Sequence, residues 1–295
     1  MIHVGVLQYR RGKYLAWALT LVAGAVALYA SEIDPRRPSG HTWQGYVLGT
    51  VGALLIVWLS LLAIRKRRYA STVGTLQGWT SAHIYLGCAL LVVATLHTGL
   101  QMGWNVHTLA YALMCLVIGS GLFGVFNYLH YPGMLAENRE GGSRALLFSE
   151  LFELDKQTRA LAETCGAQVH TAVDSSIQRT VVGGGAWAQL SSRDHSSFLR
   201  PKDGAGKTTL VTNTDQQAVI DFVAARIPRA DKVEETARLQ QLLLLLCRRQ
   251  VILRRLRRDI RLQGWLKLWL YFHVRVTMAL FVALGVHILS TFIYW

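Results

Sequence analysis

Apolar residues fill five stretches of the chain, and each stretch is long enough to cross a lipid bilayer. They are approximately Lys13–Ala30, His41–Ile64, Trp79–Gln101, His107–Leu129 and Trp265–Trp295. An α-helix needs about 20 predominantly apolar residues to span the ~30 Å hydrocarbon core. None of the five stretches contains Asp or Glu, whose charge is costly in lipid. The pattern predicts an all-α integral membrane protein with five transmembrane helices.

A polar insertion, residues 131–264, separates the fourth and fifth stretches. Within it, Ser143–Glu163 has the pattern of an amphipathic helix, and Thr180–Trp187 predicts a short strand with a tight glycine turn. We expect a polar loop over Ser191–Thr214. From about Ala230, apolar residues recur at three- and four-residue steps, which predicts a long helix in a mainly helical insertion. These residues are Leu239, Leu242, Leu243, Leu246, Leu253, Leu256 and Ile260.

Positive charge gives the expected orientation. The chain is 52% hydrophobic and has a net charge of +14, a combination typical of membrane proteins with cationic cytoplasmic segments. The charge clusters beside apolar stretches, which disfavours nucleic acid as a partner. Basic residues precede the first stretch and follow the second, at residues 10–13 and 65–68. By the positive-inside rule the N-terminus is cytoplasmic and the C-terminus periplasmic, as in a bacterial inner membrane.

The expected domains are residues 1–130 with four membrane helices, the cytoplasmic insertion 131–264, and the fifth membrane helix 265–295. The insertion ends in a basic amphipathic helix. Such a helix either lies against anionic headgroups or is a solvated helix packed on the insertion, and the sequence leaves both open. Its arginines are Arg248, Arg249, Arg254, Arg255, Arg257, Arg258 and Arg261.

Two pairs of histidines on the third and fifth stretches have the same spacing. His83 and His97 are 14 residues apart, and so are His273 and His287. Fourteen residues advance an α-helix by nearly four whole turns, so the members of a pair share one face, ~21 Å apart along the axis. In the expected orientation the two helices are parallel. His83 is then level with His273, which we name the inner pair, and His97 with His287, the outer pair.

A histidine in lipid is costly and usually pairs, relays protons or binds a group. Two parallel helices with matched pairs can hold two stacked haems, each with one axial histidine from either helix, because neutral imidazole is a standard ligand of haem iron. The alternative is four unrelated histidines, which requires coincidence to produce the same spacing twice. No Cys-x-x-Cys-His motif occurs, so the expected haem is the non-covalent b type.

The double motif resembles the di-haem cytochromes b, as in quinol–cytochrome c reductases and in the membrane domains of ferric reductases and NADPH oxidases. His83-x13-His97 and His273-x13-His287 carry the resemblance, which covers the second to fifth stretches and leaves the insertion unexplained. It implies a four-helix bundle that binds two haem b groups and passes electrons across the membrane.

The sequence shows no flavin- and nicotinamide-binding module after the fifth stretch, so we expect no self-contained NAD(P)H-driven reductase. Exchange with a quinone pool is favoured over direct reduction of a metal or oxygen. Separate redox subunits would complete the route: cytochrome c, an iron–sulfur protein or a flavoprotein. The competing interpretation, from another class, is a non-redox transporter component or anchoring subunit whose histidines relay protons.

Arg275 lies two residues after His273, and an arginine within the membrane needs an anionic partner. The propionates of the inner haem would serve, and snorkelling to the headgroups is the alternative. His41 and His107 are expected at the outer surface as interfacial residues, or near a quinone or proton path, rather than as ligands.

Glycines recur along the second and fourth stretches. They permit close approach of helices or of a porphyrin, although helix packing alone also explains them. They are Gly45, Gly49, Gly52, Gly119, Gly121 and Gly124.

The insertion far exceeds the usual connection of about 4–6 residues, which indicates a function of its own. We expect it to cap the cytoplasmic end of the bundle and to dock a soluble or peripheral redox subunit. Its positive charge would favour an acidic partner.

Overall fold

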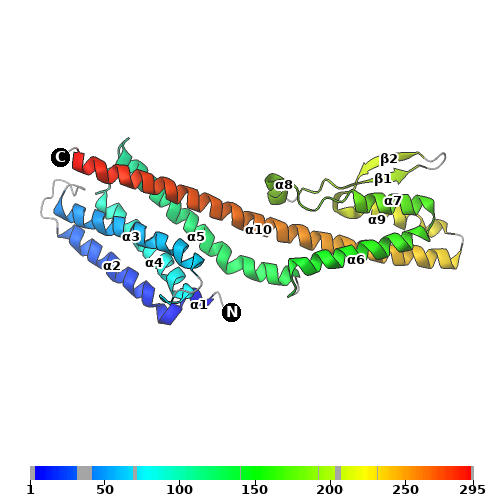
Figure 1. The fold of residues 1–295 in the computed structure, drawn as a ribbon, viewed down its shortest axis with the longest axis horizontal. Helices are drawn as coiled ribbons and strands as arrows, with labels where there is room; N and C mark the ends of the chain where they lie inside the picture. The colour runs from blue at the N-terminus through cyan, green and yellow to red at the C-terminus, as the bar shows by residue number, and fades with distance from the viewer. Residues whose placement is uncertain are drawn as a thin grey trace. The chain divides into compact units, whose positions relative to one another are not determined.

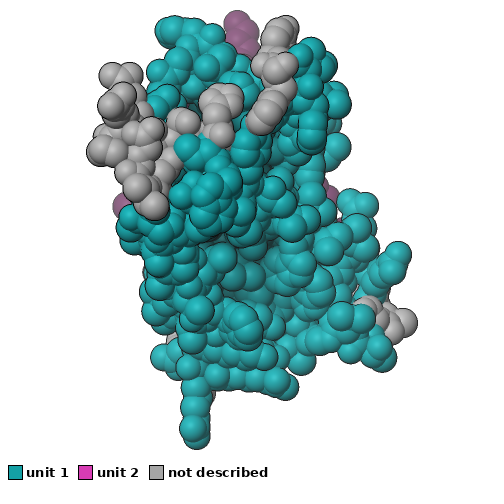
Figure 2. Space-filling model, turned by 90° about the vertical axis from the view of Figure 1, so that its left-hand side faces the viewer, with its two compact units in different colours: residues 1–130, 268–295 teal, residues 131–267 magenta. Residues whose placement is uncertain are grey.

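The computed structural model describes residues 4–31, 42–68, 72–139, 141–191, 193–202, 207–230 and 232–293 (Figure 1). It divides into two compact units (Figure 2). Unit 1 comprises Met1–His130 and Leu268–Trp295, and unit 2 comprises Tyr131–Lys267. His41 lies outside the described residues.

Unit 1 is built from helices. They are α1 (Val4–Leu7), a 3-10 turn (Tyr9–Gly12), α2 (Lys13–Ala30), α3 (Trp43–Arg67), α4 (Leu76–His97), most of α5 (Val106–Arg139) and the last part of α10 (Val233–Ile293). Five helices, α2 to α5 and α10, are long and apolar enough to cross a membrane, in agreement with the predicted all-α membrane protein. The helix of the fourth stretch extends beyond the predicted membrane-crossing part, which ends at about Leu129. α5 continues to Arg139 with Pro132 inside it, although proline removes one backbone hydrogen bond.

The starts of α3 and α4 are fixed by threonine caps. The hydroxyls of Thr42 and Thr75 accept hydrogen bonds from the backbone N–H groups of Gly45 and Gly78, each at 3.1 Å. These bonds satisfy donors that the first turn of a helix leaves unpaired. α4 packs against both α2 and α3. The caps and this packing place the histidines of α4 beside α3.

Unit 2 is mainly helical, as predicted. Its elements are α6 (Arg144–Glu163), α7 (Ala167–Gln178), α8 (Ala186–Ser191), β1 (Ser197–Pro201), β2 (Thr208–Thr212), α9 (Gln217–Ala224) and the first part of α10. The predicted helix at Ser143–Glu163 is confirmed, with Ser143 as its cap: the side-chain oxygen accepts from the Leu146 N–H at 3.1 Å. The long helix begins at Val233, close to the predicted start.

Two local predictions in the insertion are wrong. The expected polar loop over Ser191–Thr214 contains an antiparallel hairpin, β1 with β2, in which Phe198 pairs with Val211. Phe198 is 1% exposed and packs into the core of unit 2, a tertiary contact that a mainly polar stretch does not reveal. The strand expected within Thr180–Trp187 is absent from these described residues. Gly183 and Gly184 have φ of 104° and 116°, and the chain bends at Gly185.

The predicted apolar face of the long helix forms the core of unit 2. Five of its leucines are at most 2% exposed, and they contact α6, α7 and α9 in two hydrophobic clusters. They are Leu239, Leu242, Leu246, Leu253 and Leu256.

The arginines of the same helix are largely engaged within unit 2. Arg248, Arg249, Arg254 and Arg257 form ion pairs with Glu150, Asp155, Asp215 and Asp194, respectively. The structure therefore favours a charged helix packed on the insertion over one that lies on headgroups.

Candidate functional site

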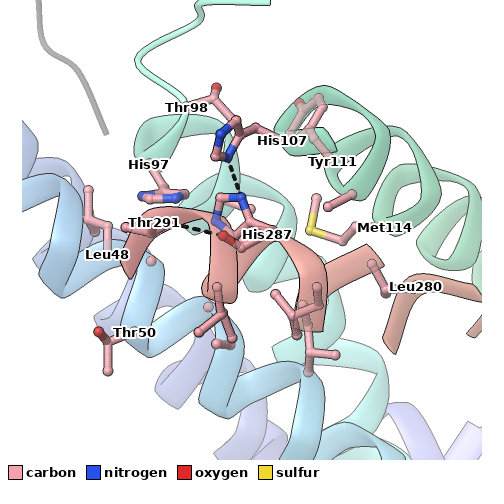
Figure 3. Close-up of a pocket in the computed structure, with 18 of the residues that line it drawn as sticks. Leu48, Thr50, His97, Thr98, His107, Tyr111, Met114, Leu280, His287 and Thr291 are labelled. Carbon is pink, nitrogen blue, oxygen red and sulfur yellow. Dashed lines mark hydrogen bonds between the residues drawn. The ribbon is translucent and has the colours of Figure 1, made fainter. Parts of the chain in front are cut away.

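α4 and α10 run in the same direction and bring the outer pair together. The rings of His97 and His287 have centres 6.0 Å apart and planes at 89° (Figure 3). Seven residues earlier on each helix, Leu90 and Leu280 lie in one hydrophobic cluster with Met114 of α5. Seven residues are two helical turns, so α4 and α10 are parallel and in register here. His97 and His287 thus stand at one level.

The outer pair lines a cavity of about 950 Å³ between α3, α4, α5 and α10 (Figure 3). Pockets for small molecules and cofactors measure about 300–1,000 Å³, so the cavity is at the upper end of this range. Thr98, Gln101 and Asn105, from the loop between α4 and α5, add polar groups to a mainly aliphatic wall. Among the described residues that line it there is no Asp, Glu, Lys or Arg. The cavity therefore suits a large, mainly apolar ligand.

Helix α3 orients both histidines of α4. The Nδ1 atom of His97 lies 2.8 Å from the carbonyl oxygen of Gly45, and the Nδ1 atom of His83 lies 3.0 Å from that of Leu59. A carbonyl oxygen only accepts, so each Nδ1–H must donate and the lone pair is on Nε2. This is the tautomer of a histidine that binds a metal through Nε2, and a carbonyl partner at the other nitrogen is usual for such ligands.

The second member of the inner pair is oriented by α5. The Nδ1 atom of His273 lies 2.7 Å from the hydroxyl oxygen of Ser120. That hydroxyl donates its proton to the carbonyl oxygen of Val117 at 2.8 Å, so it accepts from the His273 Nδ1–H. Trp269 also donates to the Ser120 carbonyl oxygen, at 2.7 Å, one turn before His273. His273 therefore has the same tautomer as His83 and His97.

The inner pair is made up of His83 on α4 and His273 on α10. Among the described residues, no hydrogen bond or ring contact joins His83 and His273. Each lies 14 residues before its outer partner on one of the two parallel helices. The register seen at His97 and His287 therefore brings the inner pair to a common level as well.

The predicted glycines make room for these rings. A Cβ atom at Gly49 would lie 2.7 Å from Cε1 of His97, and one at Gly121 would lie 3.6 Å from Cε1 of His273. At Gly124 a Cβ atom would overlap the ring of Trp269. Gly119, in contrast, has nothing within 4 Å of such an atom. Gly49 thus permits the close approach of His97 to α3, and Gly124 permits that of Trp269 to α5.

His107 belongs to the outer site, which the sequence did not indicate. Its Nδ1 atom forms a hydrogen bond with Nδ1 of His287, and the two ring centres are 4.5 Å apart (Figure 3). The short loop between α4 and α5 could have indicated this position of His107, because it returns the chain to the level of His97.

Two other candidates lie away from the cavity. Arg275 is exposed, and its guanidinium carbon is 4.6 Å from the centre of the Tyr271 ring on the same helix, a cation–π contact. No carboxylate among the described residues pairs with it, and its contact with a propionate stays a prediction. His130 is exposed, and its Nδ1 donates to the Phe126 carbonyl oxygen of its own helix at 2.8 Å.

The outer pair fits an axially ligated haem better than a bare metal ion. No group of three or more His, Cys, Asp or Glu among the described residues is arranged to hold an ion. A haem needs only two axial ligands from the protein. Metal–imidazole bonds are about 2 Å long, so two imidazoles on opposite sides of one metal have ring centres ~6 Å apart. The separation of His97 and His287 agrees with this value.

Comparisons with family models, with curated proteins and with solved structures give no match for this chain. The resemblance to the di-haem cytochromes b therefore depends on the histidines and on the geometry around them.

Proposed function

We propose that this protein is a membrane di-haem cytochrome b subunit, which carries electrons across the membrane between a quinone pool or redox partner and another subunit. One observation supports it above the others. The rings of His97 and His287 face one cavity from two parallel helices, at the separation that two axial ligands of one haem iron require.

The chain's own residues would hold two haems in equivalent ways. His97 and His287 are the axial ligands at the outer site, and His83 and His273 at the inner site. Nδ1 of His83, His97 and His273 is engaged with another helix, so each of these three would offer Nε2, and Nδ1 of His287 is hydrogen-bonded to His107. When bound, haem supplies one-electron redox chemistry at its iron. The aliphatic wall gives the outer site a mainly apolar lining.

Haem content and axial ligation test the proposal. Full-length protein purified in detergent from haem-replete cells is expected to contain two haems per chain, with the absorption spectrum of bis-histidine haem b. His97→Leu or His287→Leu should remove one haem, and His83→Leu or His273→Leu the other. Each variant should retain about one haem per chain.

His170→Leu is the matched control, because His170 lies in unit 2, where Nε2 of its ring is 3.8 Å from the carboxylate of Glu163. It should keep both haems. A colourless wild-type protein would refute the proposed function. A wild-type protein with one haem that survives substitution of His83 and of His273 would limit the proposal to the outer site.

A non-redox membrane protein remains the second candidate, because one observation favours it. His107 and His287 are hydrogen-bonded and His97 lies beside them, so the outer cavity contains three neighbouring histidines that could relay protons. This interpretation does not require haem. The same absorption spectrum distinguishes the two candidates.

The proposed setting is a bacterial inner membrane, with unit 2 in the cytoplasm and the outer pair towards the periplasm. Unit 2 is the proposed docking unit for a soluble or peripheral redox subunit. Arg258 and Arg261 are exposed, and among the described residues neither has a carboxylate partner. They are cations of α10 that remain available to an acidic partner.

A further inference from the structure

The four paired histidines differ in what receives the Nδ1 proton. For His83 and His97 the acceptor is a backbone carbonyl oxygen, and for His273 it is a hydroxyl whose own proton is already donated. All three acceptors are fixed by the fold. Only His287 has a partner, Nδ1 of His107, that can be either a donor or an acceptor depending on its tautomer.

No other described residue forms a hydrogen bond with the His287 ring. Ser290 and Thr291 both donate to the carbonyl oxygen of His287, at 2.8 and 3.0 Å, and so engage its backbone rather than its imidazole. His107 lies in the first turn of α5, over the His287 ring (Figure 3). The orientation of His287 therefore depends on one side chain from another helix.

We propose that His107 is the positioning residue of the outer site, an inference that rests on the proposed function. With its proton on Nε2, His107 accepts the Nδ1–H of His287, which fixes the tautomer of His287 and turns its Nε2 towards the cavity. His107 thus does for His287 what Gly45 does for His97. Such partners orient a ligand and raise its basicity, and their loss typically weakens metal binding about 10–100-fold.

The test compares two substitutions of His107 in the full-length protein. His107→Leu removes the acceptor, whereas His107→Gln can replace it with a side-chain amide oxygen. His130→Leu is the matched control, because His130 lies on the same helix and is bonded only to that helix. Haem content, the low-spin ferric signals in electron paramagnetic resonance and the midpoint potentials are measured for each. The outer signal is the one that His97→Leu abolishes.

We expect His107→Leu to shift the outer signal and its midpoint potential and to weaken retention of the outer haem about 10–100-fold, while the inner signal stays unchanged. His107→Gln should restore most of the wild-type outer signal, and His130→Leu should change neither signal.

An outer signal in His107→Leu identical to that of wild type would overturn the inference and leave the proposed function intact. Three results together would also overturn it. His107→Leu would lose the outer haem as completely as His287→Leu, His107→Gln would not recover it, and His97→Leu would retain haem. His107 would then be a ligand. A wild-type protein without haem would instead refute the proposed function itself.

Discussion

The two units use their polar side chains for different purposes. Unit 2 contains all but two of the 17 acidic residues of the chain, and it pairs several of them with its own arginines. Asp259 is fully buried and accepts from Arg139 and Arg144 at 2.5 and 2.6 Å. The membrane stretches of unit 1 have no carboxylates. Their distinctive polar groups are histidines, and His83, His97, His273 and His287 are each bonded through Nδ1 to a neighbouring helix.

Arg249 shows most clearly that charged side chains of unit 2 are paired within the unit. It is 1% exposed and donates to the Asp155 carboxylate, the side-chain amide oxygen of Gln216 and the Thr180 hydroxyl, at 2.5, 2.7 and 2.9 Å. Each nitrogen of its guanidinium thus has a partner from another segment. Here the polar groups are used to hold the fold together.

The comparison teaches where to look for function. A buried polar group contributes to the fold when neighbouring residues use its hydrogen-bonding capacity, as they do for the Arg249 guanidinium. A histidine oriented through one nitrogen, with the other carrying a lone pair beside a large cavity, is prepared to bind a ligand. Three predictions test this distinction, from the largest expected effect to the smallest.

The largest effect is expected for Asp155→Leu in unit 2. It leaves the buried guanidinium of Arg249 without its counter-charge, and breaking a buried ion pair in this way costs about 3–5 kcal/mol. Thermal unfolding of the purified protein in detergent, followed by circular dichroism, should show a clear loss of stability.

The double variant Asp155→Leu with Arg249→Met is the control for this experiment. Replacement of both partners by apolar residues removes the unpaired charge, so it should recover much of the lost stability. If Asp155→Leu unfolds like wild type, the network around Arg249 does not stabilise unit 2, and the contrast between the units is wrong.

The sequence predicted the framework of both units because each framework depends on residue pattern. Runs of apolar residues specified the helices that can cross a membrane, and the leucine steps from Leu239 to Leu256 specified the buried face of α10. The equal spacing of the histidines also predicted that His97 and His287 would stand level, as the structure has them.

Features set by tertiary contacts were not predictable. The carbonyl oxygens of Gly45 and Leu59 orient His97 and His83, but any residue type supplies a backbone carbonyl, so the sequence carries no sign of this role. The place of His107 beside His287 depends on how a loop returns the chain. The hairpin at Phe198 is likewise fixed by one buried ring rather than by a pattern.

An intermediate effect is expected for Gly49→Ala in unit 1. The added Cβ would lie 2.7 Å from Cε1 of His97, closer than real contacts allow, so the ring must move out of its position. His97 is a proposed axial ligand, so retention of the outer haem should weaken at least about tenfold. Changes to the residues that support a metal ligand typically weaken metal binding about 10–100-fold, and tenfold is the lower end of that range. Haem titration of the apo protein measures it.

Gly119→Ala is the control for Gly49→Ala, because nothing lies within 4 Å of a Cβ atom at Gly119. It should bind both haems like wild type. Equal haem retention in the two variants would show that the position of His97 is not critical, and that the outer cavity does not depend on the glycine beside it.

The smallest effect is expected for Arg248→Ala, which removes an exposed ion pair at the surface of unit 2. Arg248 donates to Glu150 at 2.8 Å, but its side chain is 64% exposed, so water and salt screen the pair. Exposed ion pairs contribute about 0.2–1 kcal/mol. Arg248→Ala should therefore lower the melting temperature by only a few degrees, with a smaller difference from wild type at high salt. A loss as large as that of Asp155→Leu would mean that exposed and buried charges of unit 2 are equally structural. All charges of unit 2, and not only the buried ones, would then serve the fold, and this would be the difference between unit 2 and unit 1.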